Sequence, residues 1–181
     1  MMIDRSFSTE EVLRDGTRVT VRAIRPEDST GLREGFGRLS AVSRYRRFLS
    51  SQTELSPSAL DYLTRVDFQD HAALVAYGRI REGQPVTGLG VARFIRLADE
   101  LEVAEAAVTV IDAVQGRGLG KVLLRLLTQA AIERGIRVFR AEILRDNLPV
   151  QQILHSVGAR LCDTHGPIQV VEVDLPPPSG A

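Results

Sequence analysis

The sequence predicts a mixed α/β fold, with a central and partly antiparallel sheet flanked by helices. Three strand-like segments follow one another with short turns between them, which is typical of an antiparallel meander. A helix, a strand and another helix come next, and this order implies a parallel crossover. A glycine-rich loop, Gln115 to Lys121, lies where the last meander strand meets the most regular helix.

The N-terminal third predicts a hairpin followed by helices. Asp15-Gly16 separates two segments with alternating or β-branched character, which is a strong hairpin signal. Pro26 begins a helical stretch, because apolar residues follow it at near-helical spacing. Two shorter helical pieces are expected over residues 43–49 and 56–66, the second with Ser56 as its N-cap.

The middle of the chain predicts the meander and the main helix. Strand-like segments cover residues 72–77, 86–97 and 101–111, and turn-forming groups separate them. From Leu119 onward, apolar residues repeat at helical spacing and stop before Gly135, a natural residue to end a helix.

The C-terminal part predicts a strand, a helix and a last hairpin. Residues 137–144 read as a strand, and Asn147 can N-cap the helix that Gly158 closes. Strands are expected over residues 160–163 and 168–173. We expect one domain over residues 1–175 and a flexible tail over residues 176–181.

Composition narrows the classes of function. Lys plus Arg and Asp plus Glu are both 23, so the chain lacks the overall field that favours nucleic acid or an anionic membrane. The single cysteine, Cys162, excludes an intramolecular disulfide, and we expect it to be inert core packing. With neither a signal-like N-terminus nor a long apolar run, a cytoplasmic protein without membrane or nucleic-acid partners is expected. The three histidines lack a metal-ligand spacing, so no metal site is predicted.

The glycine loop is the most informative motif. Glycines let the backbone turn several N–H groups toward a ligand, and the first turn of a helix adds unpaired donors and partial positive charge. Such a place binds phosphate. A dinucleotide fingerprint would need glycine at Lys121, and a Walker A loop would need Ser or Thr at Val122, so both fail.

The spacing that does match is Q-x-x-G-x-G, from Gln115 through Gly118 to Gly120. This loop, with the order of elements around it, resembles the acetyl-CoA loop of the GNAT superfamily of N-acetyltransferases. The resemblance implies a GNAT fold, acetyl-CoA as co-substrate, and backbone amides that hold the CoA pyrophosphate, with Arg117 and Lys121 adding charge. The cofactor-binding residues expected from it are Val108, Val110, Gln115, Gly116, Arg117, Gly118, Leu119, Gly120, Lys121 and Asn147.

Within this superfamily, the chain resembles the catalytic domain of the Pat-type bacterial protein lysine acetyltransferases. The similar segments are residues 24–28, 43–48 and 103–110. This resemblance implies that Glu105 is the catalytic general base and that the acceptor is a protein lysine, for example on a metabolic enzyme. An amine needs such a base, because a lysine side chain is almost entirely protonated at pH 7. The alternative for Glu105 is a solvated charge or an ion pair with Arg93 or Arg145.

Other readings stay open. The acceptor could be a small amine or a protein N-terminus, and a non-catalytic acyl-CoA-binding module would keep the glycine loop without needing Glu105. Many GNAT enzymes carry a tyrosine at the position of Leu154 to protonate the leaving thiolate, so a side-chain general acid is in doubt here. Three arginines between 44 and 47 are expected to form a solvated helix face, with contact to an acidic partner or to CoA as the alternative. They are Arg44, Arg46 and Arg47.

Overall fold

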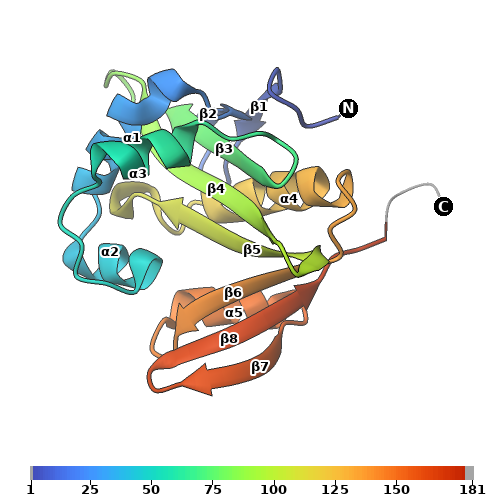
Figure 1. Ribbon diagram of the computed structural model, residues 1–181. Helices are drawn as coiled ribbons and strands as arrows, with labels where there is room; N and C mark the ends of the chain where they lie inside the picture. Colours follow the sequence, from blue (N-terminus) through green and yellow to red (C-terminus); the bar gives the residue numbers. More distant parts are fainter. Residues whose placement is uncertain (1, 178–181) are drawn as a thin grey trace.

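The computed structural model describes residues 2–177, which form one eight-stranded sheet with five α-helices and two short 3-10 helices (Figure 1). The strands are β1 (Ser8–Val12), β2 (Arg18–Ala23), β3 (His71–Gly78), β4 (Thr87–Leu97), β5 (Glu100–Val110), β6 (Val138–Leu144), β7 (Arg160–His165) and β8 (Ile168–Asp174). The helices are α1 (Ser29–Gly37), α2 (Ala41–Phe48), α3 (Pro57–Thr64), α4 (Leu119–Ile132) and α5 (Leu148–Ser156), with 3-10 helices η1 (Pro26–Asp28) and η2 (Asp112–Val114).

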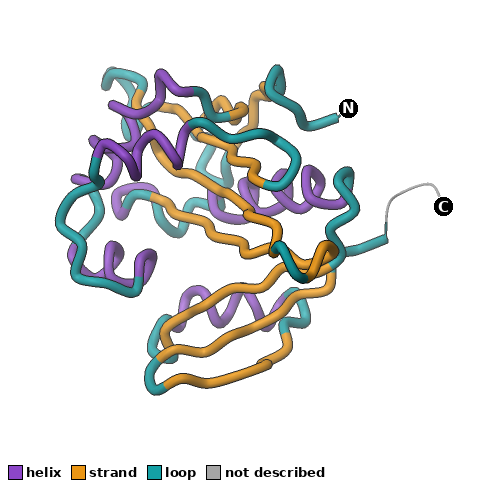
Figure 2. Tube along the Cα trace, viewed as in Figure 1, coloured by secondary structure: helices purple, strands orange, loops and turns teal. Residues whose placement is uncertain are grey.

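The sheet has the order β1-β2-β3-β4-β5-β6-β8-β7. Every neighbouring pair is antiparallel except β5 and β6, which are parallel because α4 carries the chain back between them. The predicted mixed and partly antiparallel sheet is therefore confirmed. Figure 2 shows the strands as two groups, β1 to β5 and β6 to β8, which meet only near the starts of β5 and β6.

Helices cover both faces of the larger group of strands. The apolar stripe of α4 packs on β3, β4 and β5, and Leu119, Leu123 and Leu127 are among the fully buried side chains of the main core. On the opposite face, α1 lies against β4 and contacts α3 (Figure 1). A smaller core of Phe36, Leu55 and Leu60 lies between these helices.

Serine caps account for the starts of two helices. The Ser56 Oγ accepts a hydrogen bond from the Ala59 N–H at 3.1 Å, as predicted for the start of α3. The Ser40 Oγ accepts the corresponding bond from the Ser43 N–H at 3.1 Å. The second helix therefore begins at Ala41, two residues earlier than predicted, because Ser40 is the cap.

The C-terminal hairpin contains one wrong prediction. Cys162 was expected to pack in the core, but it lies on β7, whose six residues are all exposed. β7 is the last strand of the sheet and pairs only with β8. The apolar residues of such an edge strand can therefore remain exposed, and their presence in the sequence does not indicate burial.

Among residues 2–177, no helix combines the length and apolar character needed to cross a membrane. Most of the predicted tail, residues 178–181, lies outside the described part of the chain.

Candidate active site

The loop between β5 and α4 presents a row of free backbone donors. Gly116 and Gly118 adopt left-handed backbone conformations, with φ of 78° and 96°, which only glycine adopts without strain. Within residues 2–177, the N–H groups of residues 116–120 donate to no acceptor, whereas the Lys121 N–H already bonds to the Gly118 carbonyl. Five consecutive free donors at the start of a helix are an arrangement that can bind an anion.

Two polar side chains of the loop support its backbone instead of facing a ligand. The Gln115 Nε2 donates to the Val110 carbonyl at 3.0 Å, which fixes the end of β5 against the loop. The Arg117 guanidinium donates to the Ile80 and Ala113 carbonyls at 3.1 and 2.8 Å and lies 3.4 Å from the Asp15 carboxylate. The charge of Arg117, expected near the phosphates, is thus committed to the scaffold.

A basic residue that was not predicted from the sequence packs against this loop from the β1–β2 hairpin. The Arg14 N–H, at the tip of the β1–β2 hairpin, donates to the Arg117 carbonyl at 3.3 Å. A methyl group built on Gly118 would lie 3.5 Å from Arg14 Cγ. Arg14 is exposed and forms no ion pair within residues 2–177. The Asp15-Gly16 turn was recognisable in the sequence, but no local signal shows that this turn folds against a loop a hundred residues later.

β5 and β6 separate immediately after Glu105. Their parallel pairing covers only three positions, Val103 with Val138, Ala104 with Phe139, and Glu105 with Arg140. Both strands continue beyond this point, β5 to Val110 and β6 to Leu144. The backbone of residues 106–110 therefore has an edge that no strand occupies, although its other edge stays paired with β4. Val108 and Val110 lie on this open stretch.

Asn147 lies beyond the end of β6, on the far side of this opening. It occupies the N-cap position of α5, but its side chain makes no cap hydrogen bond, so the predicted capping role is wrong. The turn is closed by its backbone carbonyl, which accepts from the Val150 and Gln151 N–H groups. Only 6% of Asn147 is exposed, and its amide bonds to no group within residues 2–177. Among the described residues no buried side-chain nitrogen or oxygen atom lacks a partner, so the Asn147 amide keeps some contact with solvent and can bind a ligand.

Glu105 occupies the last paired position before the opening. Its side chain is exposed and forms neither an ion pair within 4.0 Å nor a hydrogen bond with the described residues, so the alternative pairs with Arg93 and Arg145 are not formed. It lies on the same face of β5 as Thr109, because the two residues are four positions apart and alternate residues of a strand share a face. Glu102, on the same strand, is also exposed.

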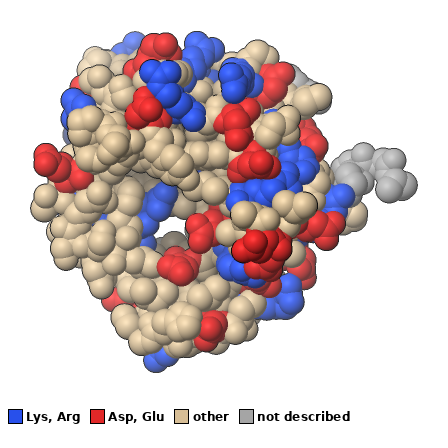
Figure 3. Space-filling view, viewed as in Figure 1, with Lys and Arg blue, Asp and Glu red and all other residues tan. Residues whose placement is uncertain are grey.

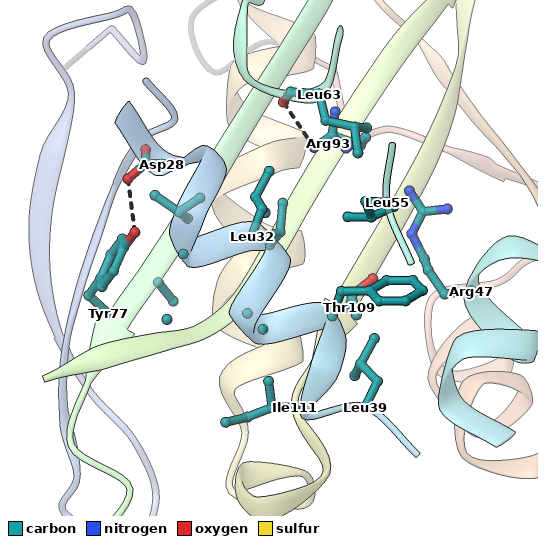
Figure 4. Close-up of a pocket in the computed structure, with 18 of the residues that line it drawn as sticks. Asp28, Leu32, Leu39, Arg47, Leu55, Leu63, Tyr77, Arg93, Thr109 and Ile111 are labelled. Carbon is teal, nitrogen blue, oxygen red and sulfur yellow. Dashed lines mark hydrogen bonds between the residues drawn. The ribbon is translucent and has the colours of Figure 1, made fainter. Parts of the chain in front are cut away.

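A cavity of about 80 Å³ lies on the Glu105 side of the sheet (Figure 4). Its walls are mostly apolar, with Leu32, Phe36 and Phe48 from the helices, Val91 and Thr109 from the strands, and Ile111 directly after β5. Figure 3 shows a separate hollow near the centre of the molecule, with basic and acidic side chains on its rim.

One end of the cavity is closed by a carboxylate with several donors. Asp28 accepts hydrogen bonds from Arg22, from the Arg25 N–H and from the Tyr77 hydroxyl, at 2.6 to 2.8 Å. Burial alone would raise the pKa of Asp28, but these bonds lower it overall. Burial and the bond to Asp28 raise the pKa of Tyr77 to about 12, so this hydroxyl stays protonated near neutral pH.

Two arginines line the other end. Arg93 is only 5% exposed, and it donates to His71 Nε2 at 3.0 Å and to the Leu63 carbonyl at 3.2 Å. Arg47 extends from α2 alongside Leu55 (Figure 4) and is half-buried. Burial lowers the pKa of the Arg47 guanidinium, and the charge of Glu105 partly offsets this effect. The prediction that Arg47 lies on a solvated helix face is therefore wrong, because α2 turns it toward the cavity.

The remaining residues considered in the sequence analysis do not line this cavity or have no reactive side-chain group. Leu154 is half-buried on α5, and His155 and His165 are exposed. Within residues 2–177, no three His, Cys, Asp or Glu side chains are grouped so that they could hold a metal ion.

Comparison with known proteins agrees with this geometry. Residues 41–158 match the model of the Acetyltransferase (GNAT) family. The chain is 33% identical over 165 residues to Acetyltransferase Pat of Mycolicibacterium smegmatis, which covers 91% of this chain and 48% of that protein. The chain thus spans about half the length of this relative.

Two solved structures have the same fold. The GNAT domain of S. lividans PAT superposes with a TM-score of 0.83 at 31% identity, covering 93% of this chain and 97% of that one. The yncA protein of Salmonella typhimurium, described as a putative acetyltransferase with its cofactor acetyl-CoA, superposes with a TM-score of 0.69 at 21% identity, covering 90% and 96%.

Proposed function

The chain belongs to the GNAT family of acetyltransferases, and from this premise we propose that it transfers the acetyl group of acetyl-CoA to a protein lysine, with Glu105 as general base. The single observation that carries the proposal is the separation of β5 and β6 directly after Glu105. It leaves an open strand edge, an anion site and a free carboxylate in one continuous path.

The cofactor fits this path from one end to the other. The free N–H groups of residues 116–120 would hold the pyrophosphate, and Arg14 and Lys121 would contribute positive charge beside it. The open edge of β5 at Val108 and Val110 would pair with the amides of the extended pantetheine arm. The unpartnered amide of Asn147 would contact the same arm from the other side.

The thioester would then lie where β5 and β6 separate, next to Glu105. The carboxylate of Glu105 takes a proton from the acceptor ammonium, directly or through one water, and the neutral amine attacks the thioester carbonyl. The new C–N bond forms as the C–S bond breaks, the attacking nitrogen releases its second proton to solvent to give the amide, and solvent protonates the CoA thiolate, since Leu154 has no proton to donate. Glu105 can accept the proton because no cation holds it in an ion pair.

The protein lysine as acceptor rests on the likeness to the Pat-type enzymes around residues 24–28, 43–48 and 103–110. A free Glu105 carboxylate also favours an enzyme over a non-catalytic acyl-CoA-binding module, which would not need one.

The test compares Glu105→Gln with Glu102→Gln, which removes another exposed carboxylate from the same strand. With a lysine peptide at pH 7, thiol release by Glu105→Gln should fall about 10²–10⁴-fold while acetyl-CoA still binds, because a positioned base contributes that much. Glu102→Gln should keep the wild-type rate. Raising the pH toward 9.5 supplies neutral amine and should restore part of the Glu105→Gln rate.

Wild-type turnover by Glu105→Gln at pH 7 would remove this residue from the mechanism. Acetyl-CoA binding by the wild type without turnover of any amine would favour the binding module instead.

A further inference from the structure

Helix α2 carries a concentration of positive charge that the fold does not neutralise. Between Glu34 and Glu54 the sequence contains four arginines and no acidic residue. Three of them, Arg44, Arg46 and Arg47, lie on α2. None of these three forms an ion pair within 4.0 Å in the described part of the chain, in contrast to Arg140, which pairs with both Glu100 and Glu172.

The α2 arginines are nevertheless held in place by other contacts. Arg44 donates to the Thr53 carbonyl at 3.3 Å and lies over the Phe36 ring, 5.5 Å from its centroid. Arg46 donates to the Asp146 carbonyl at 3.5 Å, across the opening between α2 and the end of β6. Side chains that are oriented without being paired can bind an incoming anion without a large loss of rotamer entropy.

Arg47 is the innermost of the three and has the least favourable surroundings. It is half-buried, its guanidinium lies 4.9 Å from the centroid of the Phe48 ring, and the buried Arg93 is a like charge in the same cavity wall. Glu105 supplies the only opposite charge that acts on it among the described residues, without forming an ion pair. A partly desolvated cation in this position is stabilised when an anion binds beside it.

The outer arginines line a groove that leads away from the site. This groove, of about 940 Å³, lies between α2 and the segment after β6, and Arg44, Arg46 and Arg145 are among its lining residues. Val42 and Tyr45 add apolar surface and are 58% and 43% exposed. Asp146 is the only acidic residue of the lining. A mixed basic and apolar groove of this size suits an extended acidic peptide segment.

We propose that the acceptor lysine lies in an acidic segment, and that Arg47 binds the carboxylate of an Asp or Glu next to it. Arg44, Arg46 and Arg145 bind acidic residues further along the same segment. The inference rests on the proposed lysine acetylation and specifies its acceptor, because α2 contacts β5 and the charges of Arg47 and Glu105 act on each other, so an acceptor bound at Glu105 lies near Arg47.

The test uses two peptides that differ only beside one lysine, with Glu in the first and Gln in the second. The full chain should acetylate the Glu peptide with a kcat/KM about tenfold higher, as expected for one charge-assisted contact. The advantage should shrink as ionic strength rises, because the outer arginines are open to solvent. Arg47→Gln should remove most of the advantage, and Arg47→Lys, which keeps the charge, should retain part of it.

Arg18→Gln is the matched control, since Arg18 is an exposed arginine of β2 that lines neither cavity. It should keep the wild-type preference. Because the preference is a ratio within one variant, any effect of Arg47→Gln on Glu105 itself cancels.

Equal kcat/KM for the two peptides with the wild type, or an unchanged ratio in a folded Arg47→Gln protein, overturns this inference and leaves the proposed lysine acetylation intact. Acetylation of neither peptide, with acetyl-CoA still bound, overturns the lysine acceptor and this inference with it.

Discussion

His71 should make the protein sensitive to mild acid. Its Nε2 accepts a hydrogen bond from the Arg93 guanidinium at 3.0 Å, which requires a neutral ring, and only 8% of the residue is exposed. Burial and, to a lesser extent, the positive charge of Arg93 lower the pKa of His71 from 6.5 to about 4, while the Asp67 carboxylate opposes the shift. Protonation of the ring would set two cations against each other below α3.

The size of the effect follows from the two pKa values. The unfolded chain binds this proton near pH 6.5, whereas the folded protein binds it only near pH 4. Between these values the unfolded state carries one more proton, so the free energy of unfolding decreases as the pH falls. The full difference corresponds to about 3 kcal/mol as an upper limit, a large part of the typical stability of a domain.

Urea unfolding between pH 7 and pH 4.5 measures this term. The window excludes most of the contribution of carboxylates with lowered pKa, such as Asp28 and Asp67, which lose their stabilising charge at lower pH. His71→Gln should unfold more easily at pH 7 but show a nearly flat profile, and His165→Gln, at an exposed position, should keep the wild-type slope. Parallel slopes for the wild type and His71→Gln across this window would refute the reasoning.

Three further predictions concern the cofactor. Gly118→Glu should reduce the affinity for acetyl-CoA, measured by calorimetry, by at least about 100-fold, because it adds backbone strain at φ 96° and places a carboxylate among the phosphate donors. Gly118→Ala is the control that adds the strain without the charge. Unchanged affinity in a folded Gly118→Glu protein would exclude the loop as the site. Asn147→Ala should raise the KM for acetyl-CoA, and it should lower the free energy of unfolding by less than the roughly 1 kcal/mol of a lost cap, because the side chain caps nothing. A lower melting temperature with an unchanged KM would contradict this. Arg14→Ala should raise the KM for acetyl-CoA roughly tenfold with little effect on kcat, whereas Arg18→Ala should not; an unaltered KM would place Arg14 outside the phosphate site.

The sequence by itself determined the features that depend on neighbouring residues. The apolar repeat of α4, the serine cap of α3 and the Asp15-Gly16 turn are local signals, so helices and hairpins were predicted within a few residues of their observed bounds. The glycine loop was equally readable, because its function depends on the backbone of consecutive residues at a strand–helix junction.

Only the tertiary structure decided which distant residues meet and which side chains remain free. The same asparagine signal fits a cap or a ligand contact, and the structure excludes the cap because the Asn147 side chain makes no cap hydrogen bond. Arg14 approaches Gly118 through the docking of a hairpin, and Arg47 enters the cavity through the orientation of α2. The position of Glu105 at the last pairing of β5 with β6 is likewise set by where the two halves of the sheet diverge. These outcomes depend on contacts between segments far apart in the chain, and local periodicity and spacing carry no information about such contacts.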